Sequence, residues 1–206
     1  MKILVDAPIN SLSLGNVSFN IIRELFEKGH DVGIWPTGKV DLSAYDVPED
    51  LKDKILNSID NRYSFLKPDI PVLKIWHLSG SENRKNEKQY LFSFYECNKP
   101  TDQEIKLCEA QTETFFSSKH ASDLFSSSFC PLGFDKDFYE TKKEYLSGIT
   151  HFGLMGKFEH RKHTGKIIRT WLKTYGNNPK YQLSCLINNP FYKPEDMQKT
   201  IDAILQ

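Results

Sequence analysis

The sequence predicts an α/β protein in which helices cover a parallel sheet. Two stretches of the chain support this, because each contains a short apolar strand, then a loop, then a helix with one apolar face. The first stretch begins at Lys2 and the second at Ile149. Two strands joined through a helix run parallel, and their crossover is right-handed. We therefore expect a Rossmann-like first unit and an incomplete second Rossmann-like unit, which has too few strands for a complete doubly wound domain.

The first unit should contain several strands, each bounded by polar or turn-forming residues. We expect strands at 2–6, 30–35, 71–76, 89–95, 112–117 and 128–132. Apolar residues at helical spacing predict helices at 17–26, 51–59, 103–110 and 119–125. Gly29 is placed to end the first helix in the left-handed conformation. The Ser/Asn/Gly-rich segment 8–16 is expected to be a loop, and the very polar segment 79–88 a mobile surface loop.

A change of unit is expected between residues 138 and 148, where the chain carries charge without a strong period. We place the first domain at 1–142 and the second at 143–206. A second run of alternating elements follows this boundary. It should contain strands at 149–156 and 181–187 and helices at 164–175 and 194–205.

Composition excludes several classes of function. The 27 basic residues equal the 27 acidic ones, so no net positive field suggests nucleic acid as a partner. No apolar run approaches the ~18 residues of a membrane-spanning helix, and the first run is too short for a secretion signal. The four cysteines form no Cys-x-x-Cys pair and predict reduced thiols, hence the cytoplasm, including its membrane face. The histidines show no metal-ligand spacing, so we predict no metal.

The segment 156–162, Gly-Lys-Phe-Glu-His-Arg-Lys, has the composition and position of an anion-binding loop, and we call it the cation loop. It follows a predicted strand and precedes a predicted helix, whose positive dipole end and free N–H groups attract anions. Open α/β sheets bind ligands at such strand ends, which favours a diphosphate site. The other interpretation is a solvated loop whose charges Glu159 balances. The candidate phosphate-binding residues here are Gly156, Lys157, Arg161 and Lys162.

Three further positions are candidates for polar contacts with a ligand: Gly15, His77 and Asn188. Gly15 would allow close backbone approach in the first loop, although an ordinary turn before a helix has the same composition. His77 follows an apolar strand and could act as an acid or base, although a lone histidine is more often structural. Asn188 would lie beside the cation loop, where Asn-Asn-Pro is also a turn signal. No Gly-x-Gly-x-x-Gly sequence follows the first strand, which argues against a dehydrogenase.

Together these segments resemble the GT-B glycosyltransferases, in particular the large retaining family four of bacterial mannosyl- and glucosyltransferases. The family's N-terminal strand, glycine loop and first helix are similar to KILVDAPINSLSLGNVSFNIIRELFEKGHDVGIW. Its serine strand, helix and entry into the interdomain linker are similar to TFFSSKHASDLF and CPLGFDKDFY. The start of its nucleotide-sugar domain resembles THFGLMGKFEHRKHTGKIIRTWLKTY. This resemblance spans most of the chain and implies a cleft between two Rossmann-like domains.

The resemblance implies transfer of a sugar, with retention, from a nucleotide-diphosphate sugar to an unknown acceptor, which is a glycan, a lipid or a small molecule. It implies Lys157 and Lys162 as a clamp on the diphosphate. Lys157 stands where the family usually has arginine, so it keeps the charge and loses the planar fork. Gly15 corresponds to the loop glycine near the donor phosphates and His77 to an active-site histidine near the sugar. Asn188 and Asn189 occupy a loop that usually contains glycine. No cofactor or metal is implied.

One part of the family's pattern is absent from the sequence. The Glu-x7-Glu segment, which holds the sugar and the ribose, would lie beyond the second helix of the second domain. We therefore interpret the second domain as truncated, naturally or as a fragment, or as completed by a partner or a homodimer that covers its sheet edge. The alternative function is a non-catalytic binding or assembly module derived from such an enzyme. A third is another α/β enzyme with a phosphorylated ligand, such as an epimerase of related architecture.

Overall fold

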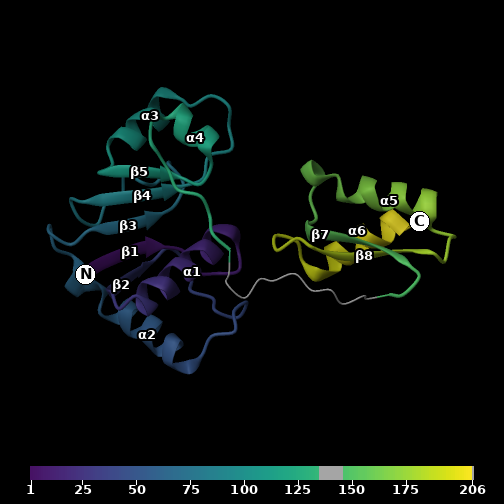
Figure 1. The fold of residues 1–206 in the computed structure, drawn as a ribbon, viewed down its shortest axis with the longest axis horizontal. Helices are drawn as coiled ribbons and strands as arrows, with labels where there is room; N and C mark the ends of the chain where they lie inside the picture. The colour runs from purple at the N-terminus through teal and green to yellow at the C-terminus, as the bar shows by residue number, and fades with distance from the viewer. Residues whose placement is uncertain (135–145, 206) are drawn as a thin grey trace. The chain divides into compact units, whose positions relative to one another are not determined.

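The computed structural model describes residues 1–134 and 146–205. The chain divides into two compact units, Met1–Asp135 and Lys136–Gln206, which we describe separately (Figure 1). The boundary expected after residue 142 lies outside the described residues. Each unit contains parallel strands and helices, so the predicted α/β class is confirmed.

The first unit is built on a six-stranded sheet in the order β2-β1-β3-β4-β5-β6 (Figure 1). Every neighbouring pair of strands in this sheet is parallel, as the order of elements predicts. Its strands are β1 (Lys2–Ala7), β2 (Asp31–Pro36), β3 (Val72–Ile75), β4 (Gln89–Ser93), β5 (Glu113–Phe116) and β6 (Ser128–Phe129). The last strand is shorter than the segment 128–132 that apolar content suggests.

The helices of the first unit follow the predicted order with shifted ends. They are α1 (Ser13–Glu27), α2 (Glu49–Asp60), the 3-10 turn η1 (Arg62–Phe65), α3 (Asp102–Glu109) and α4 (Lys119–Leu124). The main difference is at α1, which begins at Ser13 and so takes in part of the expected loop 8–16. The Leu12 N–H donates to the Asn10 side-chain oxygen at 3.0 Å, and this local turn stands before the helix.

Gly29 ends α1 as its position predicts. Its φ of 73° is in the left-handed region. The Gly29 N–H donates to the Phe26 carbonyl at 2.9 Å, and the His30 N–H donates to the Leu25 carbonyl at 3.0 Å. This pair of bonds is the Schellman arrangement, which satisfies the last carbonyls of the helix and turns the chain into β2.

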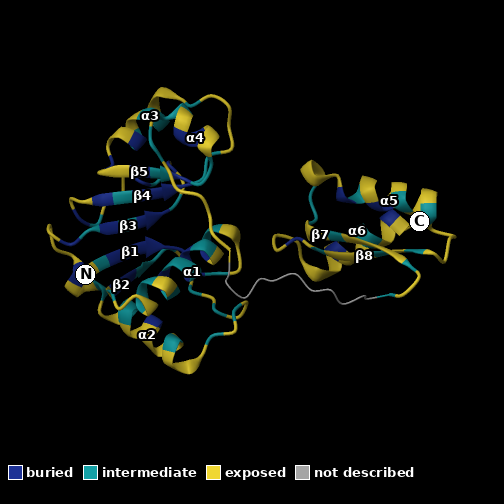
Figure 2. Cartoon of the chain, in the orientation of Figure 1, coloured by how far each residue is buried: buried dark blue, intermediate teal, exposed yellow. Residues whose placement is uncertain are grey.

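The core of the first unit lies on both faces of the sheet, and its central strands are the most buried elements (Figure 2). Successive side chains of a strand point to opposite faces. On one face, Val5 and Ala7 pack with Phe19 and Ile22 of α1. On the other, Leu4 packs in a separate cluster with Phe65, Ile70 and Val72, against which Trp35 is partly buried. The apolar residues of the strands therefore serve two cores.

The polar segment 79–88 is anchored by hydrogen bonds. Asn86 is buried, and its amide donates to the carbonyls of Phe65 and Ile70 at 2.9 and 2.8 Å. Ser81 is also buried, and its carbonyl accepts from the Gln89 side chain at 2.7 Å. Most residues of the segment are exposed, so it is a surface loop as expected, and its buried residues Ser81 and Asn86 are hydrogen-bonded; its mobility stays a prediction.

The second unit contains a two-stranded parallel sheet among its described residues. Its elements are β7 (Thr150–Lys157), the 3-10 turn η2 (His160–Lys162), α5 (Thr164–Tyr175), β8 (Tyr181–Asn188) and α6 (Pro194–Leu205). Aromatic rings join the sheet to α5: Phe152 stacks on Tyr175 with ring centroids 5.8 Å apart, and Tyr175 contacts Tyr181 at 4.5 Å. Ile204 of α6 packs against Gly165.

Candidate functional site

The cation loop lies between the carboxyl end of β7 and the start of α5. Lys157 is the last residue of β7, and Arg161 and Lys162 belong to η2. Parallel pairing places Lys157 opposite Asn188, the last residue of β8. The Phe158 N–H also donates to the Asn188 carbonyl at 2.7 Å. The loops that follow both strands therefore meet at one edge of the sheet, which is where a parallel sheet places ligand-binding residues.

Three cations of the loop surround a single carboxylate, that of Glu159. The Lys157 ammonium lies 3.2 Å from one Glu159 oxygen. The Arg161 guanidinium lies 3.2 Å from the other oxygen, and the Lys162 ammonium lies 4.0 Å from it. The sequence suggested that Glu159 balances these charges, and the geometry agrees with that part of the interpretation. The same geometry means that the three cations can approach one oxyanion.

The cations also set the protonation of Glu159. Burial acts to raise the pKa of this carboxyl, but the hydrogen bond from Lys157 and the charges of Lys157, Arg161 and Lys162 outweigh it, so the pKa is lowered. Glu159 is therefore a carboxylate at neutral pH and acts as an internal counter-ion. Because Glu159 and Lys157 are partly exposed and Arg161 is largely exposed, salt weakens their attraction.

The backbone of the loop has two unusual conformations next to the cations. Gly156 has a φ of 129°, a region that a side chain rarely allows, and a Cβ there would lie 3.7 Å from the Lys162 ammonium. His163 has a φ of 53° and precedes α5 without making a side-chain cap. The first N–H groups of α5 therefore lack a capping side chain in this described segment, and such groups are donors for an anion.

Asn189, the second asparagine of the Asn-Asn-Pro turn, holds the two loops together. Its side chain is buried, donates to the Phe158 carbonyl at 2.8 Å and accepts from the Phe191 N–H at 3.1 Å. The Asn188 side-chain oxygen accepts from the Asn189 N–H at 2.8 Å. The Lys157 ammonium lies 5.1 Å from the centre of the Phe191 ring. The Asn-Asn-Pro turn signal identified the place but not which asparagine is buried.

The other two candidates, Gly15 and His77, belong to the first unit. Gly15 is buried in the first turn of α1. A Cβ at this position would lie 2.5 Å from the Asn10 backbone nitrogen, so the chain itself makes the close approach that the glycine permits. His77 follows β3, is exposed, and packs edge-on to Trp76 with ring centroids 5.5 Å apart.

The described residues offer no group of three or more His, Cys, Asp or Glu side chains that could hold a metal ion. None of the helices in these residues is both long and apolar enough to cross a membrane. Comparison of the sequence with protein-family models and with curated proteins found no match.

Proposed function

We propose that the chain is a GT-B-type glycosyltransferase that uses a nucleotide-diphosphate sugar and binds its diphosphate at the cation loop. The observation that carries this proposal is the convergence of Lys157, Arg161 and Lys162 on one carboxylate beside the start of α5. The six-stranded parallel sheet of the first unit agrees with a Rossmann-like fold. The resemblance of the sequence to family four supplies the reaction, because the fold alone specifies no chemistry.

In the proposed reaction, the diphosphate leaves the anomeric carbon of the sugar, and negative charge grows on its oxygens. Lys157 and Lys162 stabilise that charge, together with the first N–H groups of α5. Preorganised cations and amides lower the barrier because little reorganisation is needed when the charge develops. Glu159 must yield its place, since its carboxylate occupies the position that a phosphate oxygen would take.

Replacing Lys162 by alanine should weaken the binding of UDP or GDP about tenfold, because a charge-assisted contact to the diphosphate is lost. The measurement is isothermal titration calorimetry of each nucleotide with the wild-type protein and the variant. Lys173→Ala is the matched control, since Lys173 is exposed near the other end of α5. Equal affinity of the wild type and Lys162→Ala would remove the clamp assignment.

Replacing Glu159 by glutamine should strengthen nucleotide-diphosphate binding about threefold at low salt, because the cations lose their internal competitor. The gain should shrink as the pH falls below the ordinary Glu value of 4.5 and through the lowered pKa of Glu159, where the protonated carboxyl is as neutral as the amide. Glu195→Gln, an exposed change at the start of α6, is the control. Weaker nucleotide binding by Glu159→Gln would contradict the idea that the Glu159 carboxylate competes with the diphosphate for the cations.

A second candidate function is a non-catalytic assembly module, and two exposed side chains favour it. Met155 and Leu186 are 75% and 74% exposed and lie directly opposite each other in the β7–β8 pair. Adjacent exposed apolar residues on a sheet are a common feature of association surfaces. A sugar-transfer assay separates the two functions. No turnover, together with a dimer that Met155→Ser and Leu186→Ser dissociate in light scattering, would favour the module.

A further inference from the structure

A buried ion pair lies at the carboxyl end of the first unit's sheet. Asp6 of β1 is paired in register with Trp35 of β2 and with Lys74 of β3. The Lys74 ammonium donates to Asp6 at 2.9 Å, although the two side chains are only 7% and 3% exposed. Removing two charges from water is unfavourable unless they are well paired, so a pair kept at this depth invites a functional explanation.

The pair retains unused hydrogen-bonding capacity. The Thr37 hydroxyl donates to the second Asp6 oxygen at 3.1 Å. Lys74 also donates to the Asn83 carbonyl at 3.2 Å. An ammonium has three N–H donors, and within the described residues Lys74 uses two of them. One donor therefore remains for a further acceptor.

Lys74 itself lines a pocket of ≈ 380 Å³. Asp6, Thr37 and Lys74 line it with polar groups, and Trp35, Pro36 and Trp76 supply apolar walls. The volume falls within the range of ordinary small-molecule sites, which combine apolar walls with a few convergent polar groups. This pocket has both features, because Asp6 and Lys74 are buried polar residues and the walls beside them are apolar.

The topology places the pocket where open α/β sheets bind ligands. The chain passes from β1 to β2 on one side and then returns to β3 on the other side of β1, as the strand order β2-β1-β3 requires. The sheet therefore switches direction between β1 and β3, and ligands bind outside the carboxyl ends of strands at such a switch point. Asp6 and Lys74 lie on the two strands that flank it.

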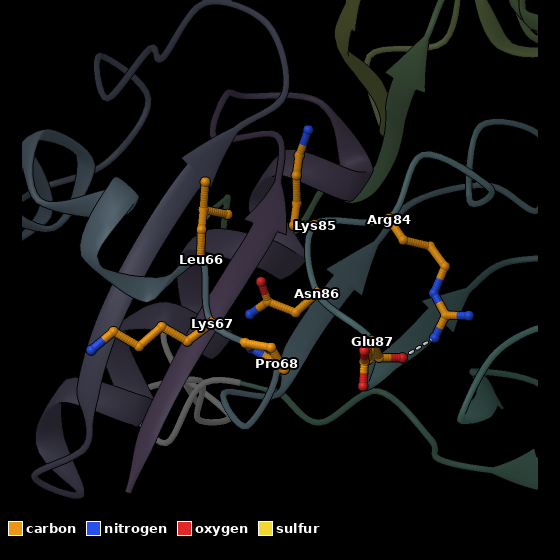
Figure 3. A pocket seen from close by; sticks show the side chains of 7 residues that line it. All are labelled: Leu66, Lys67, Pro68, Arg84, Lys85, Asn86 and Glu87. Carbon is orange, nitrogen blue, oxygen red and sulfur yellow. Dashed lines mark hydrogen bonds between the residues drawn. The ribbon is translucent and has the colours of Figure 1, made fainter.

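A larger hollow of ≈ 510 Å³ lies nearby, but its polar side chains do not converge on one point. Figure 3 shows that the charged ends of Arg84 and Lys85 point away from each other there. Arg84 donates to the carbonyls of Ala110 and Glu87, and the Asn86 amide is already bonded to two carbonyls. We therefore assign no ligand to the larger hollow.

The charge around the smaller pocket favours an anion. Asp6 and Lys74 neutralise each other, which leaves Lys85 as the further charged residue of the lining. Its ammonium lies 4.4 Å from the centre of the Trp35 ring. We propose that this pocket binds a small ligand whose oxyanion, a carboxylate or a phosphate, contacts Lys74 and Lys85 while its body lies against Trp76. The residues of this site all belong to the first unit, and the proposal does not depend on the glycosyltransferase proposal.

The test uses three probes with the same ring: benzoate, phenyl phosphate and benzyl alcohol. Trp171→Phe is introduced so that tryptophan fluorescence reports Trp35 and Trp76 alone. Either or both anions should change the fluorescence saturably, with a dissociation constant of about 1 mM or tighter. Benzyl alcohol should bind at least about tenfold more weakly, because it lacks the charge. The tighter of the two anions identifies carboxylate or phosphate as the preferred group.

Lys85→Met should weaken the anionic probes about fivefold or more, because the charge that favours them is lost while the stem remains. Lys67→Met is the control, since Lys67 lines the larger hollow and not this pocket. An unchanged thermal midpoint of Lys85→Met shows that the fold is intact. Lack of saturable binding by both anions, equal binding of benzyl alcohol, or anion binding that Lys85→Met leaves unchanged would overturn the proposal.

Discussion

Replacing Lys74 by methionine should destabilise the first unit by about 3–5 kcal/mol, because the Asp6 carboxylate stays buried without its partner. The Lys74 ammonium is 2.9 Å from Asp6, and both side chains are almost fully buried. Chemical denaturation in the Trp171→Phe background measures this change, since the remaining tryptophans Trp35 and Trp76 both lie in the first unit.

Two comparisons show whether the loss comes from the unpaired charge. Adding Asp6→Asn to Lys74→Met should recover much of the stability, because no buried charge is then left alone while the amide can still accept from Thr37. Lys119→Met breaks an exposed pair with Asp123 and should change stability by less than about 0.5 kcal/mol. A Lys74→Met protein within about 1 kcal/mol of the wild type would contradict the argument.

Replacing Gly15 by alanine should destabilise the first unit by about 1–3 kcal/mol, because a Cβ there overlaps Asn10. The overlap involves the Asn10 backbone, which cannot rotate away as a flexible side chain would. Asn10 is itself held, since its carbonyl accepts from the Tyr45 hydroxyl at 2.5 Å and its side chain accepts from the Leu12 N–H. The same denaturation experiment measures the change.

The matched control for Gly15→Ala is Gly133→Ala, because a Cβ at position 133 meets no atom of the described residues within 4 Å. This second variant should differ from the wild type by less than about 0.5 kcal/mol. If Gly15→Ala is as stable as the control and loses only nucleotide affinity, Gly15 serves a ligand instead of packing. Loss of stability would show that close packing against Asn10 is enough to require glycine at position 15, without any ligand.

The order of elements could be predicted because it depends on local patterns. The apolar run after Lys2 and the helical spacing of Val17, Ile21 and Leu25 are visible within short windows of sequence. The left-handed conformation of Gly29 was predicted correctly, because a helix often ends at a glycine that adopts it. The start of α1 was misplaced because small polar residues suit both a loop and the first turn of a helix.

The sequence predicts which residues belong to the candidate site, and the structure shows the distances and contacts between them. The residues Lys157, Arg161 and Lys162 were selected for their charge and their place between a strand and a helix. Their common approach to Glu159 depends on the 3-10 turn and on the positive φ of Gly156 and His163. The burial of Asn189 could not be predicted, because it results from pairing between β7 and β8, which composition does not reveal.

The sequence by itself determined the α/β class, the parallel strands and the cation-rich segment 156–162, because strand and helix periodicities and charge are local properties. Only the tertiary structure decided that Asp6 meets Lys74, which lies 68 positions away in the chain. The available signals were a charged residue in each of two apolar strands, Asp6 and Lys74, and their pairing could not be known before the strand order was known. Similarly, the charges of the cation loop and its Glu159 are visible in the sequence, whereas the approach of the three cations to that carboxylate is visible only in the structure.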